Sequence, residues 1–380
     1  MNQISRLIAK LCPLGVGFQL LGNLEDSGVV KLGRGNVISK TDLASSPGDY
    51  PVYSSSAAGS GEFGRYGKFM FEDERITWSI DGGGRFFYRS PHNYSVTNVC
   101  GWLKVIDCSK ISTRFLFHVL TGLWETKVFD YTKKAHPSVI REEYLIPLPP
   151  IEIQAEIVRI LDAFTAMTAE LTAELNLRKK QYNYDRDRLL SFEEGEVEWK
   201  TLGGLVEVNT GSKPSEILEN ATSIDYINAG TSRSGYSAES NCEGDTVTTP
   251  SRGQGGIGFV GYQKKPFWLG PLCYKLQSTD KTVLINKYLF YFLQSRSELL
   301  LGLKKEGGVP AVNKSDLVQL EIPVPSVEEQ KRIVAILDKF DALTNSLSEG
   351  LPREIELRQK QYEYYRDLLL SFPKPEEAEA

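Results

Sequence analysis

The sequence predicts an α+β chain: two β-rich domains separated by two long helices that pack as an antiparallel coiled coil. The main observation is that one long helical segment occurs twice, as residues 146–192 and 322–372. Each copy also follows a segment of similar length that contains short strand-like runs. Two copies at so long a period indicate a tandem duplication and not a solenoid. We therefore expect a pseudo-two-fold axis and two comparable but non-identical surfaces.

In both helical segments, seam residues recur at alternating steps of four and three, as in the a/d seam of a coiled coil. The seam of the first copy is Ile157, Leu161, Phe164, Thr168, Leu171, Leu175, Arg178, Tyr182, Asp185 and Leu189. That of the second is Ile333, Leu337, Phe340, Thr344, Leu347, Leu351, Ile355, Arg358, Tyr362, Tyr365 and Leu369. The extra step of four after Leu351 is a stutter, and Gly350 and Pro352 should kink or interrupt the second helix.

The first helix should run from about 152 to 190, after Pro149 and Pro150, and span roughly 57 Å. Ser326 and Glu329 have the spacing of a capping box before the second helix. Because neither apolar stripe can be buried alone, the two helices should pack against each other. Pairing between separate chains is the alternative.

The segments before the helices should be β-rich, with predicted strands at 76–80, 85–89 and 101–106 and a similar pattern at 244–262. Both halves open alike (21–24 and 202–205), and 114–120 parallels 287–293. The predicted boundaries are 1–145 for the first domain, 146–192 for the first helix, 193–321 for the second domain, 322–372 for the second helix and 373–380 for an acidic tail.

Composition favours a soluble protein, because 41% hydrophobic and 24% charged residues are ordinary values, and the cysteine pattern favours the cytoplasm. No apolar stretch approaches the ~18 residues of a membrane span, and the first residues do not resemble a signal peptide. The odd number of cysteines, with no C-x-x-C pair, favours reduced thiols; they are Cys12, Cys100, Cys108, Cys242 and Cys273.

The net charge of −5 argues against strong phosphate binding by the chain alone. Much of the negative charge lies in the junction after the first helix and in the tail, so local basic surface is possible. These acids are Glu193, Glu194, Glu196, Glu198, Glu376, Glu377 and Glu379.

No convincing catalytic or metal-binding set is present in the sequence. Residues 253–258 match G-x-G-x-x-G, but a strand-like run follows where a dinucleotide site needs a helix. Residues 61–68 lack a glycine that a phosphate-binding loop requires. Only three histidines occur, and no adenine-methyltransferase tetrapeptide. We expect no cofactor or metal in this chain.

Basic, amide and hydroxyl side chains in glycine-rich loops suit DNA reading, because they bind base edges and phosphates. In the first half the candidates are Lys31, Arg34, Lys40, Tyr53, Ser54, Arg65, Lys68, Arg85, Arg89, Lys133 and Lys134. In the second they are Lys213, Asn228, Thr231, Arg233, Thr249, Ser251, Arg252, Gln254, Lys304 and Lys305. Solvated surface charge is the alternative for each residue, and Trp78 and Tyr88 are expected in the core.

The helical pattern I-P-[LV]-P…E-x-Q…I-V-x-I-L-D-x-F…L-R-x-K-Q-Y-x-Y-x-R-D-x-L-L-S-F occurs twice. It resembles the conserved regions of the specificity (S) subunits of type I restriction–modification systems. The tandem tetrapeptide Thr168, Ala169, Glu170, Leu171 and Thr172, Ala173, Glu174, Leu175 resembles the type IC subfamily in particular.

The resemblance implies two target-recognition domains, each binding one half of a bipartite, asymmetric double-stranded DNA target. It also implies assembly with two methyltransferase (M) subunits and with restriction (R) subunits. Those partners would carry S-adenosylmethionine, ATP and Mg, and the S chain itself would catalyse nothing.

Three other interpretations remain. A stand-alone nuclease or methyltransferase needs a catalytic set that is absent from the sequence. A coiled-coil protein with two ligand-binding or sugar-binding modules would bind no DNA. A specificity subunit of a methylation-only or other defence system would lack a restriction partner.

In the subfamily, the number of Thr-Ala-Glu-Leu units sets the length of the non-specific spacer between the half-sites. Four residues add roughly 6 Å of helix, against ~3.4 Å for each base pair of DNA. Deleting Thr172–Leu175 should therefore shorten the spacer and leave both half-site sequences unchanged. Methylation maps of the deletion variant check this, and an unchanged spacer would contradict the ruler role.

Overall fold

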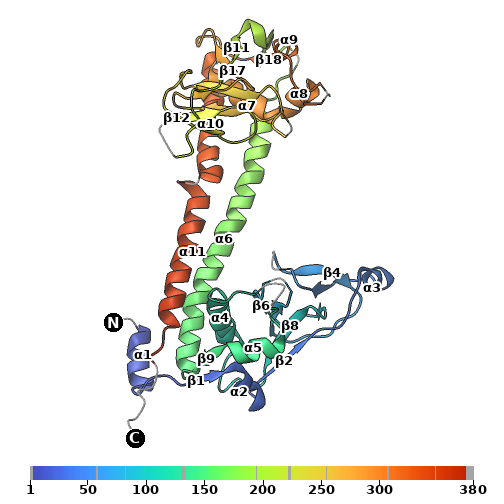
Figure 1. Ribbon diagram of the computed structural model, residues 1–380, viewed down its shortest axis with the longest axis vertical. Helices are drawn as coiled ribbons and strands as arrows, with labels where there is room; N and C mark the ends of the chain where they lie inside the picture. Colours follow the sequence, from blue (N-terminus) through green and yellow to red (C-terminus); the bar gives the residue numbers. More distant parts are fainter. Residues whose placement is uncertain are drawn as a thin grey trace. The chain divides into compact units, whose positions relative to one another are not determined.

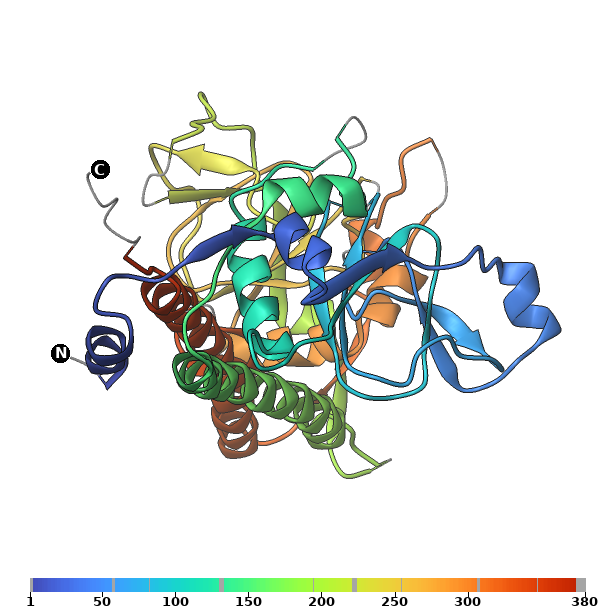
Figure 2. The same ribbon diagram turned by 90° about the horizontal axis from the view of Figure 1, so that it is seen from below.

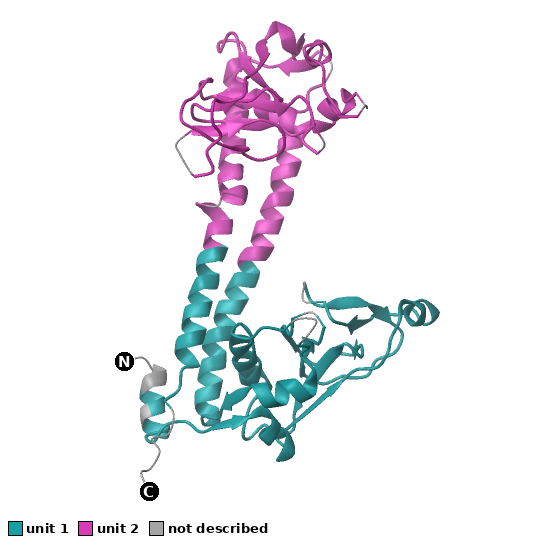
Figure 3. Ribbon diagram, viewed as in Figure 1, with its two compact units in different colours: residues 1–170, 355–380 teal, residues 171–354 magenta. Residues whose placement is uncertain are grey.

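The computed structural model describes residues 3–56, 59–81, 83–129, 133–193, 195–220, 224–253, 255–305, 308–346 and 348–373. The chain forms two compact units (Figure 3). Unit 1 comprises residues 1–170 and 355–380, and unit 2 comprises residues 171–354. Both divisions fall inside the long helical segments, so each unit contains parts of both.

In its described residues, unit 1 contains nine strands. Helices lie before and after them in the chain (Figure 1). Its strands are β1 (Phe18–Leu20), β2 (Val30–Arg34), β3 (Tyr50–Tyr53), β4 (Glu62–Tyr66), β5 (Arg75–Ser79), β6 (Phe86–Arg89), β7 (Ser95–Val96), β8 (Cys100–Val105) and β9 (Leu145–Pro147). Its helices are α1 (Gln3–Leu11), α2 (Leu21–Asp26), α3 (Lys40–Ser45), α4 (Thr113–Trp124), α5 (Pro137–Glu143) and the first half of α6 (Ile151–Leu189), with most of α11 (Gly350–Leu369).

Unit 2 repeats this plan, and the part of it that the structure describes also contains nine strands. They are β10 (Glu198–Thr201), β11 (Val206–Thr210), β12 (Ile224–Ile227), β13 (Gly235–Ser237), β14 (Thr246–Pro250), β15 (Gly261–Gln263), β16 (Trp268–Leu269), β17 (Cys273–Ser278) and β18 (Glu321–Val324). Besides the rest of α6, its helices are η1 (Leu202–Gly204), α7 (Asn286–Ser295), α8 (Ser297–Gly302), α9 (Lys314–Leu317) and α10 (Val327–Asn345).

The two units contain the same three sheets. The antiparallel four-stranded sheet has the order β2-β8-β5-β6 in unit 1 and β11-β17-β14-β15 in unit 2. The three-stranded sheets, β4-β3-β7 and β13-β12-β16, each combine one antiparallel and one parallel pairing. The third sheet is a two-stranded antiparallel ribbon, β1-β9 in unit 1 and β10-β18 in unit 2. The duplication therefore includes the domains as well as the helices.

The strands predicted at 76–80, 85–89 and 101–106 are confirmed as β5, β6 and β8 within one residue at each end. In β8, Leu103 and Val105 are buried while Lys104 between them is half-exposed, which is the alternation of a strand with one face on the core. Trp78 in β5 is fully buried, as expected for a core residue. Helix α4 packs on this sheet through Phe115, Leu116, Val119 and Leu120, and α7 packs equivalently in unit 2.

The predicted first helix is confirmed as α6, whose 39 residues cover Ile151–Leu189. All ten predicted seam residues of α6 are buried or half-buried. The start of α6 and the end of α11 share the core of unit 1, where Ile157 and Leu161 join Leu369 and Phe372. They lie side by side and antiparallel (Figures 1 and 2). In unit 2, Tyr182 and Leu190 from the end of α6 share a core with Ile333 and Leu337 from the start of α10.

The predicted interruption of the second helix is also confirmed. Helix α10 ends at Asn345 and α11 begins at Gly350. Gly350 has φ +75°, and a Cβ there would lie 2.4 Å from the carbonyl oxygen of Ala342, so the turn requires glycine. The Ser326 hydroxyl caps α10 by accepting from the Glu329 N–H, but the Glu329 carboxylate pairs with Arg332.

The sequence also predicts reduced cysteines and the absence of a membrane span. All five cysteines carry free thiols. Within the described ranges, every helix is too short or too polar to span a bilayer.

Candidate nucleic-acid interface

In unit 2, a glycine-rich loop (residues 251–260) joins β14 to β15. Gly253, Gly255 and Gly258 have φ values of +119°, +82° and +93°, which favour glycine. Because β15 follows the loop where a dinucleotide site would need a helix, the G-x-G-x-x-G match is not a dinucleotide fingerprint. The loop instead presents its backbone close to a neighbouring hairpin.

Backbone bonds tie this loop to residues 305–312. The Gly253 N–H donates to the Pro310 carbonyl at 3.0 Å, and the Val312 N–H donates to the Ser251 carbonyl at 2.9 Å. Arg252 and Lys305 both form β-bridges with Ala311. Three predicted residues, Ser251, Arg252 and Lys305, with Lys304 adjacent, therefore lie around one segment. Arg252 and Lys305 are exposed, although the Lys305 ammonium lies 3.0 Å from Asp316.

Other candidates of unit 2 have different surroundings. The Asn228 Oδ1 accepts from the Leu272 N–H and the buried Thr249 hydroxyl donates to the Phe259 carbonyl, so both support the loops from within. Arg233 pairs with Asp225 and stacks on Tyr236. Thr231 and Lys213 are exposed. Gln254 lies outside the described residues.

In unit 1, residues 80–85 form the corresponding loop between β5 and β6. The Ala135 N–H donates to the Ile80 carbonyl, as Val312 does to Ser251 in unit 2. Lys134 pairs with Asp81 of the loop at 3.0 Å, while Lys133 pairs with Glu143. Arg85 at the end of the loop is exposed and stacks on Phe87. Both units therefore place cations beside a glycine-containing loop after the equivalent strand.

Tyr53, Ser54 and Arg89 form a cluster beneath the β3–β4 loop and not an exposed reading surface. Arg89 is 6% exposed, stacks 3.5 Å from the centre of the Tyr53 ring, and donates to the Thr77 hydroxyl and the Ser60 carbonyl. Burial lowers the pKa of the Arg89 guanidinium, although arginine stays charged. The Ser54 hydroxyl lies 2.9 Å from that of Thr97. These groups hold the loop in place.

The remaining candidates of unit 1 lie on other elements. Lys31 and Arg34 are exposed on the edge strand β2, and Lys40 is the first residue of α3. Arg65 on β4 pairs with Glu62, and Lys68 follows that strand as an exposed residue. The structure does not bring these five residues together with Arg85 and Lys134.

The polar residues of the E-x-Q and L-D-x-F motifs were not predicted as functional, because neither motif indicates a contact partner. Gln154 and Gln330 are fully buried, and each makes two hydrogen bonds to the segment that begins α4 or α7 and one to the turn before its own helix. Asp162 and Asp338 lie eight residues further on. Partial burial raises the pKa of the Asp162 carboxyl, but the His118 hydrogen bond and the Arg114 charge outweigh it, so the pKa lies below its ordinary value.

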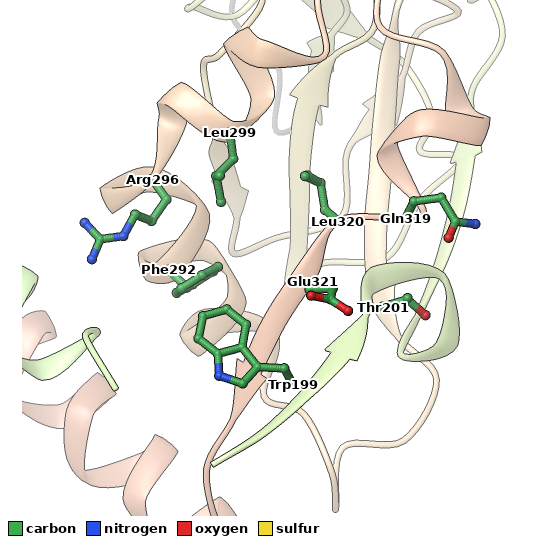
Figure 4. Close-up of a pocket in the computed structure, with 8 residues that line it drawn as sticks. All are labelled: Trp199, Thr201, Phe292, Arg296, Leu299, Gln319, Leu320 and Glu321. Atoms are coloured by element: carbon green, nitrogen blue, oxygen red, sulfur yellow. The ribbon is translucent and has the colours of Figure 1, made fainter. Parts of the chain in front are cut away.

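A separate groove of about 540 Å³ lies in unit 2 between the β10–β18 ribbon and helices α7 and α8 (Figure 4). Trp199 and Phe292 lie next to each other in its wall (Figure 4), with ring centres 6.5 Å apart and ring planes at 74°. Its charged residues are Arg296, which donates to the Ser191 hydroxyl, and Glu321. None of the predicted DNA-reading residues lines this groove.

No cluster of three or more His, Cys, Asp or Glu side chains suited to a metal ion occurs in the described part of the chain. The groups that gather at the glycine-rich loops are hydroxyls, backbone amides and cations, two of which pair with Asp81 and Asp316. This set suits binding of a polyanion by phosphate contacts and base-edge hydrogen bonds.

Comparison with known proteins agrees with the duplicated fold. Residues 24–178 and 194–357 each match the type I restriction modification DNA specificity domain. The specificity subunit of the type I restriction enzyme EcoR124I/EcoR124II from Escherichia coli is 49% identical over 71% of this chain and 73% of its own length. A putative type I restriction enzyme specificity subunit from Haemophilus influenzae is 34% identical over 80% of this chain and 84% of its own.

The fold is also that of a solved structure, a type I restriction–modification S subunit from M. genitalium. The TM-score is 0.63 at 19% sequence identity, over 93% of this chain and 95% of the other. Together with the two matched domains, these similarities show that the chain belongs to the family of type I restriction–modification specificity subunits.

Proposed function

We propose that this chain directs a methyltransferase complex to a bipartite, asymmetric DNA sequence, with each unit reading one half-site. The observation that supports this most is the pair of units with identical sheet order but different loops. Because the sheets are arranged identically, both units can bind DNA in the same orientation. The different side chains in their loops then select different bases. A protein with one continuous target would not need two such frames.

In unit 2, DNA would lie against the glycine-rich loop 251–260. Arg252 and Lys305 would bind phosphates there, and the glycines would let the backbone approach them closely. In unit 1, Arg85 and Lys134 would do the same beside loop 80–85. Because the net charge is −5, these few cations act locally, and the partner subunits would supply much of the remaining DNA affinity.

The spacer role of the helices is supported by the burial pattern of α6, which has buried residues near both ends and none in the middle. Leu161 is the last buried residue of α6 in unit 1, and Tyr182 is the first in unit 2. All residues from 162 to 181 are described, and none is buried. The two Thr-Ala-Glu-Leu units lie within this stretch. Adding or removing one therefore changes the helix length without altering either core.

We further propose that two methyltransferase subunits bind the long helices at equivalent positions. Leu177 and Tyr184 are exposed on α6, seven residues apart, and Leu357 and Tyr364 are exposed in the same way on α11. Residues seven apart lie on one face of a helix. Two matching apolar stripes suit two copies of one partner. S-adenosylmethionine, ATP and Mg would bind to the methyltransferase and restriction subunits.

The function is tested by co-expressing the chain with its methyltransferase subunit and sequencing host DNA for methyladenine. We expect one bipartite motif with a fixed spacer. Exchanging residues 193–321 for the equivalent segment of another specificity subunit should change one half-site only. A complex that forms but methylates no bipartite motif would contradict the function, and a change in both half-sites would contradict modular reading.

Arg252→Gln should weaken binding of the assembled complex to its target about threefold to tenfold. Because one phosphate contact is lost, the slope of log K against log salt should fall by about 1. Titrations at several salt concentrations measure both effects. Lys281→Gln is the matched control, because Lys281 pairs with Asp245 at the opposite end of β14. An unchanged salt slope for Arg252→Gln would place this loop away from DNA.

Tyr184→Glu should prevent the methyltransferase subunit at α6 from binding, and Tyr364→Glu should prevent the one at α11 from binding. Each variant should therefore form a complex with a single methyltransferase subunit. Both side chains are about two-thirds exposed, so folding should be unaffected. Light scattering measures the mass of the purified complex. Asn183→Glu is the control, since it adds the same charge about 100° around the helix. Full-mass complexes from both tyrosine variants would exclude the stripes as docking sites.

A further inference from the structure

In each unit, the domain is attached to its long helix by polar contacts at the same two positions, a glutamine and an aspartate eight residues further on. In unit 1, the Gln154 Nε2 donates to the carbonyls of Lys110 at 2.9 Å and Pro149 at 2.8 Å. Its Oε1 accepts from the Ser112 N–H at 2.9 Å, and Ser112 is the N-cap residue of α4. One buried amide thus fixes the start of α4 to the first turn of α6.

Eight residues further along α6, about 12 Å by helix geometry, a second contact fixes the middle of α4. The Asp162 Oδ1 accepts from the His118 Nε2 and from the Arg114 Nε, both at 2.8 Å. With Nε2 donating, the His118 Nδ1 accepts from the Tyr362 hydroxyl of α11, 3.2 Å away. The domain is therefore fixed at two points and cannot pivot about either.

Unit 2 contains the same joint with different chemistry. The Gln330 Nε2 donates to the carbonyls of Val283 at 2.8 Å and Pro325 at 2.9 Å, and its Oε1 accepts from the Ile285 N–H at 2.8 Å. Ile285 is the N-cap residue of α7.

The second contact of this joint is Asp338, again eight residues further on. It accepts from the Tyr291 hydroxyl and lies 3.5 Å from the Lys287 ammonium. The glutamine contact is thus identical in both units, while tyrosine and lysine stand where unit 1 has histidine and arginine.

We infer that Gln154 and Gln330 are positioning residues that determine which spacer lengths the protein accepts. The inference rests on the proposed bipartite reading. Helix length alone fixes the distance between two points on α6. It cannot fix where a reading loop lies if the domain can tilt on its helix. Since one base pair is ~3.4 Å, any tilt at the joint that moves a loop by this distance shifts its reading position by one base pair.

The burial of these joints makes them strong constraints. Both glutamines are fully buried, so losing either amide leaves two carbonyls and one N–H without their protein partners, and the Pro149 or Pro325 carbonyl among them lies in a buried contact. Glutamate at position 154 would keep the acceptor for the Ser112 N–H but place a carboxylate oxygen against the Lys110 and Pro149 carbonyls. Gln154→Glu therefore removes the donated bonds with little change of volume.

The test maps methyladenine in cells that express the methyltransferase subunit with each variant. The unmodified chain should methylate targets with a single spacer length. Gln154→Glu and Gln330→Glu should each raise methylation at spacers one base pair longer or shorter by about tenfold relative to the preferred spacer. Both half-site sequences should stay unchanged. Asp162→Asn, at a partly exposed residue, should have a smaller effect in the same direction.

Leu103→Ala is the matched control, because Leu103 is fully buried in β8 of unit 1 and outside the joint. It should lower the total methylation without relaxing the spacer. The inference fails if Gln154→Glu and Asp162→Asn assemble and methylate with an unchanged spacer, or if Leu103→Ala relaxes the spacer equally. If a glutamate variant does not fold, Asp162→Asn decides alone. Failure of the unmodified chain to methylate a bipartite target would instead contradict the proposed function.

Discussion

The burial of the two ends of each long helix is the constraint on which the structure depends. Ile153 and Ile157 at the start of α6 complete the core of unit 1 together with Leu369 and Phe372 from the far end of the second helical segment. Each such side chain contributes about 1.5–3 kcal/mol on burial. Because each unit needs the start of one helix and the end of the other, the antiparallel arrangement within each unit follows from the apolar seams.

Anchoring at the ends leaves the middle of α6 without a core to maintain. Its seam residues there are only half-buried, and salt links such as Glu174 to Arg178 are local to the helix. A segment of this kind tolerates insertions, since helix propagation needs only continued hydrogen bonding and a solvated face. The polar joints at Gln154 and Gln330 have the opposite character, because each glutamine makes two hydrogen bonds to the segment that begins α4 or α7.

The helices, several strands and the duplication were predictable, because heptad and alternating periods are local properties of the sequence. The break at Gly350 was predictable for the same reason. The structural role of Arg89 was not predictable. An arginine in a strand is expected to be exposed, and its place beneath the loop follows only from its contacts with Tyr53 and Ser60. Gln154 was recognisable as part of a motif, but its hydrogen-bond partners near Ser112 lie about forty residues away in the sequence. Periodicity predicts which face of a helix is buried, but it does not identify the residues that this face contacts.

Unit 1 is assembled from segments that flank unit 2 in the chain, and this imposes an order on folding during synthesis. Residues 171–354 leave the ribosome as one continuous stretch and can form their core at once. Unit 1 must wait, because Leu369 and Phe372 of its core are translated after all of unit 2. Its β-sheets therefore spend the longest time with an incomplete apolar face. The domain encoded first is therefore the one completed last.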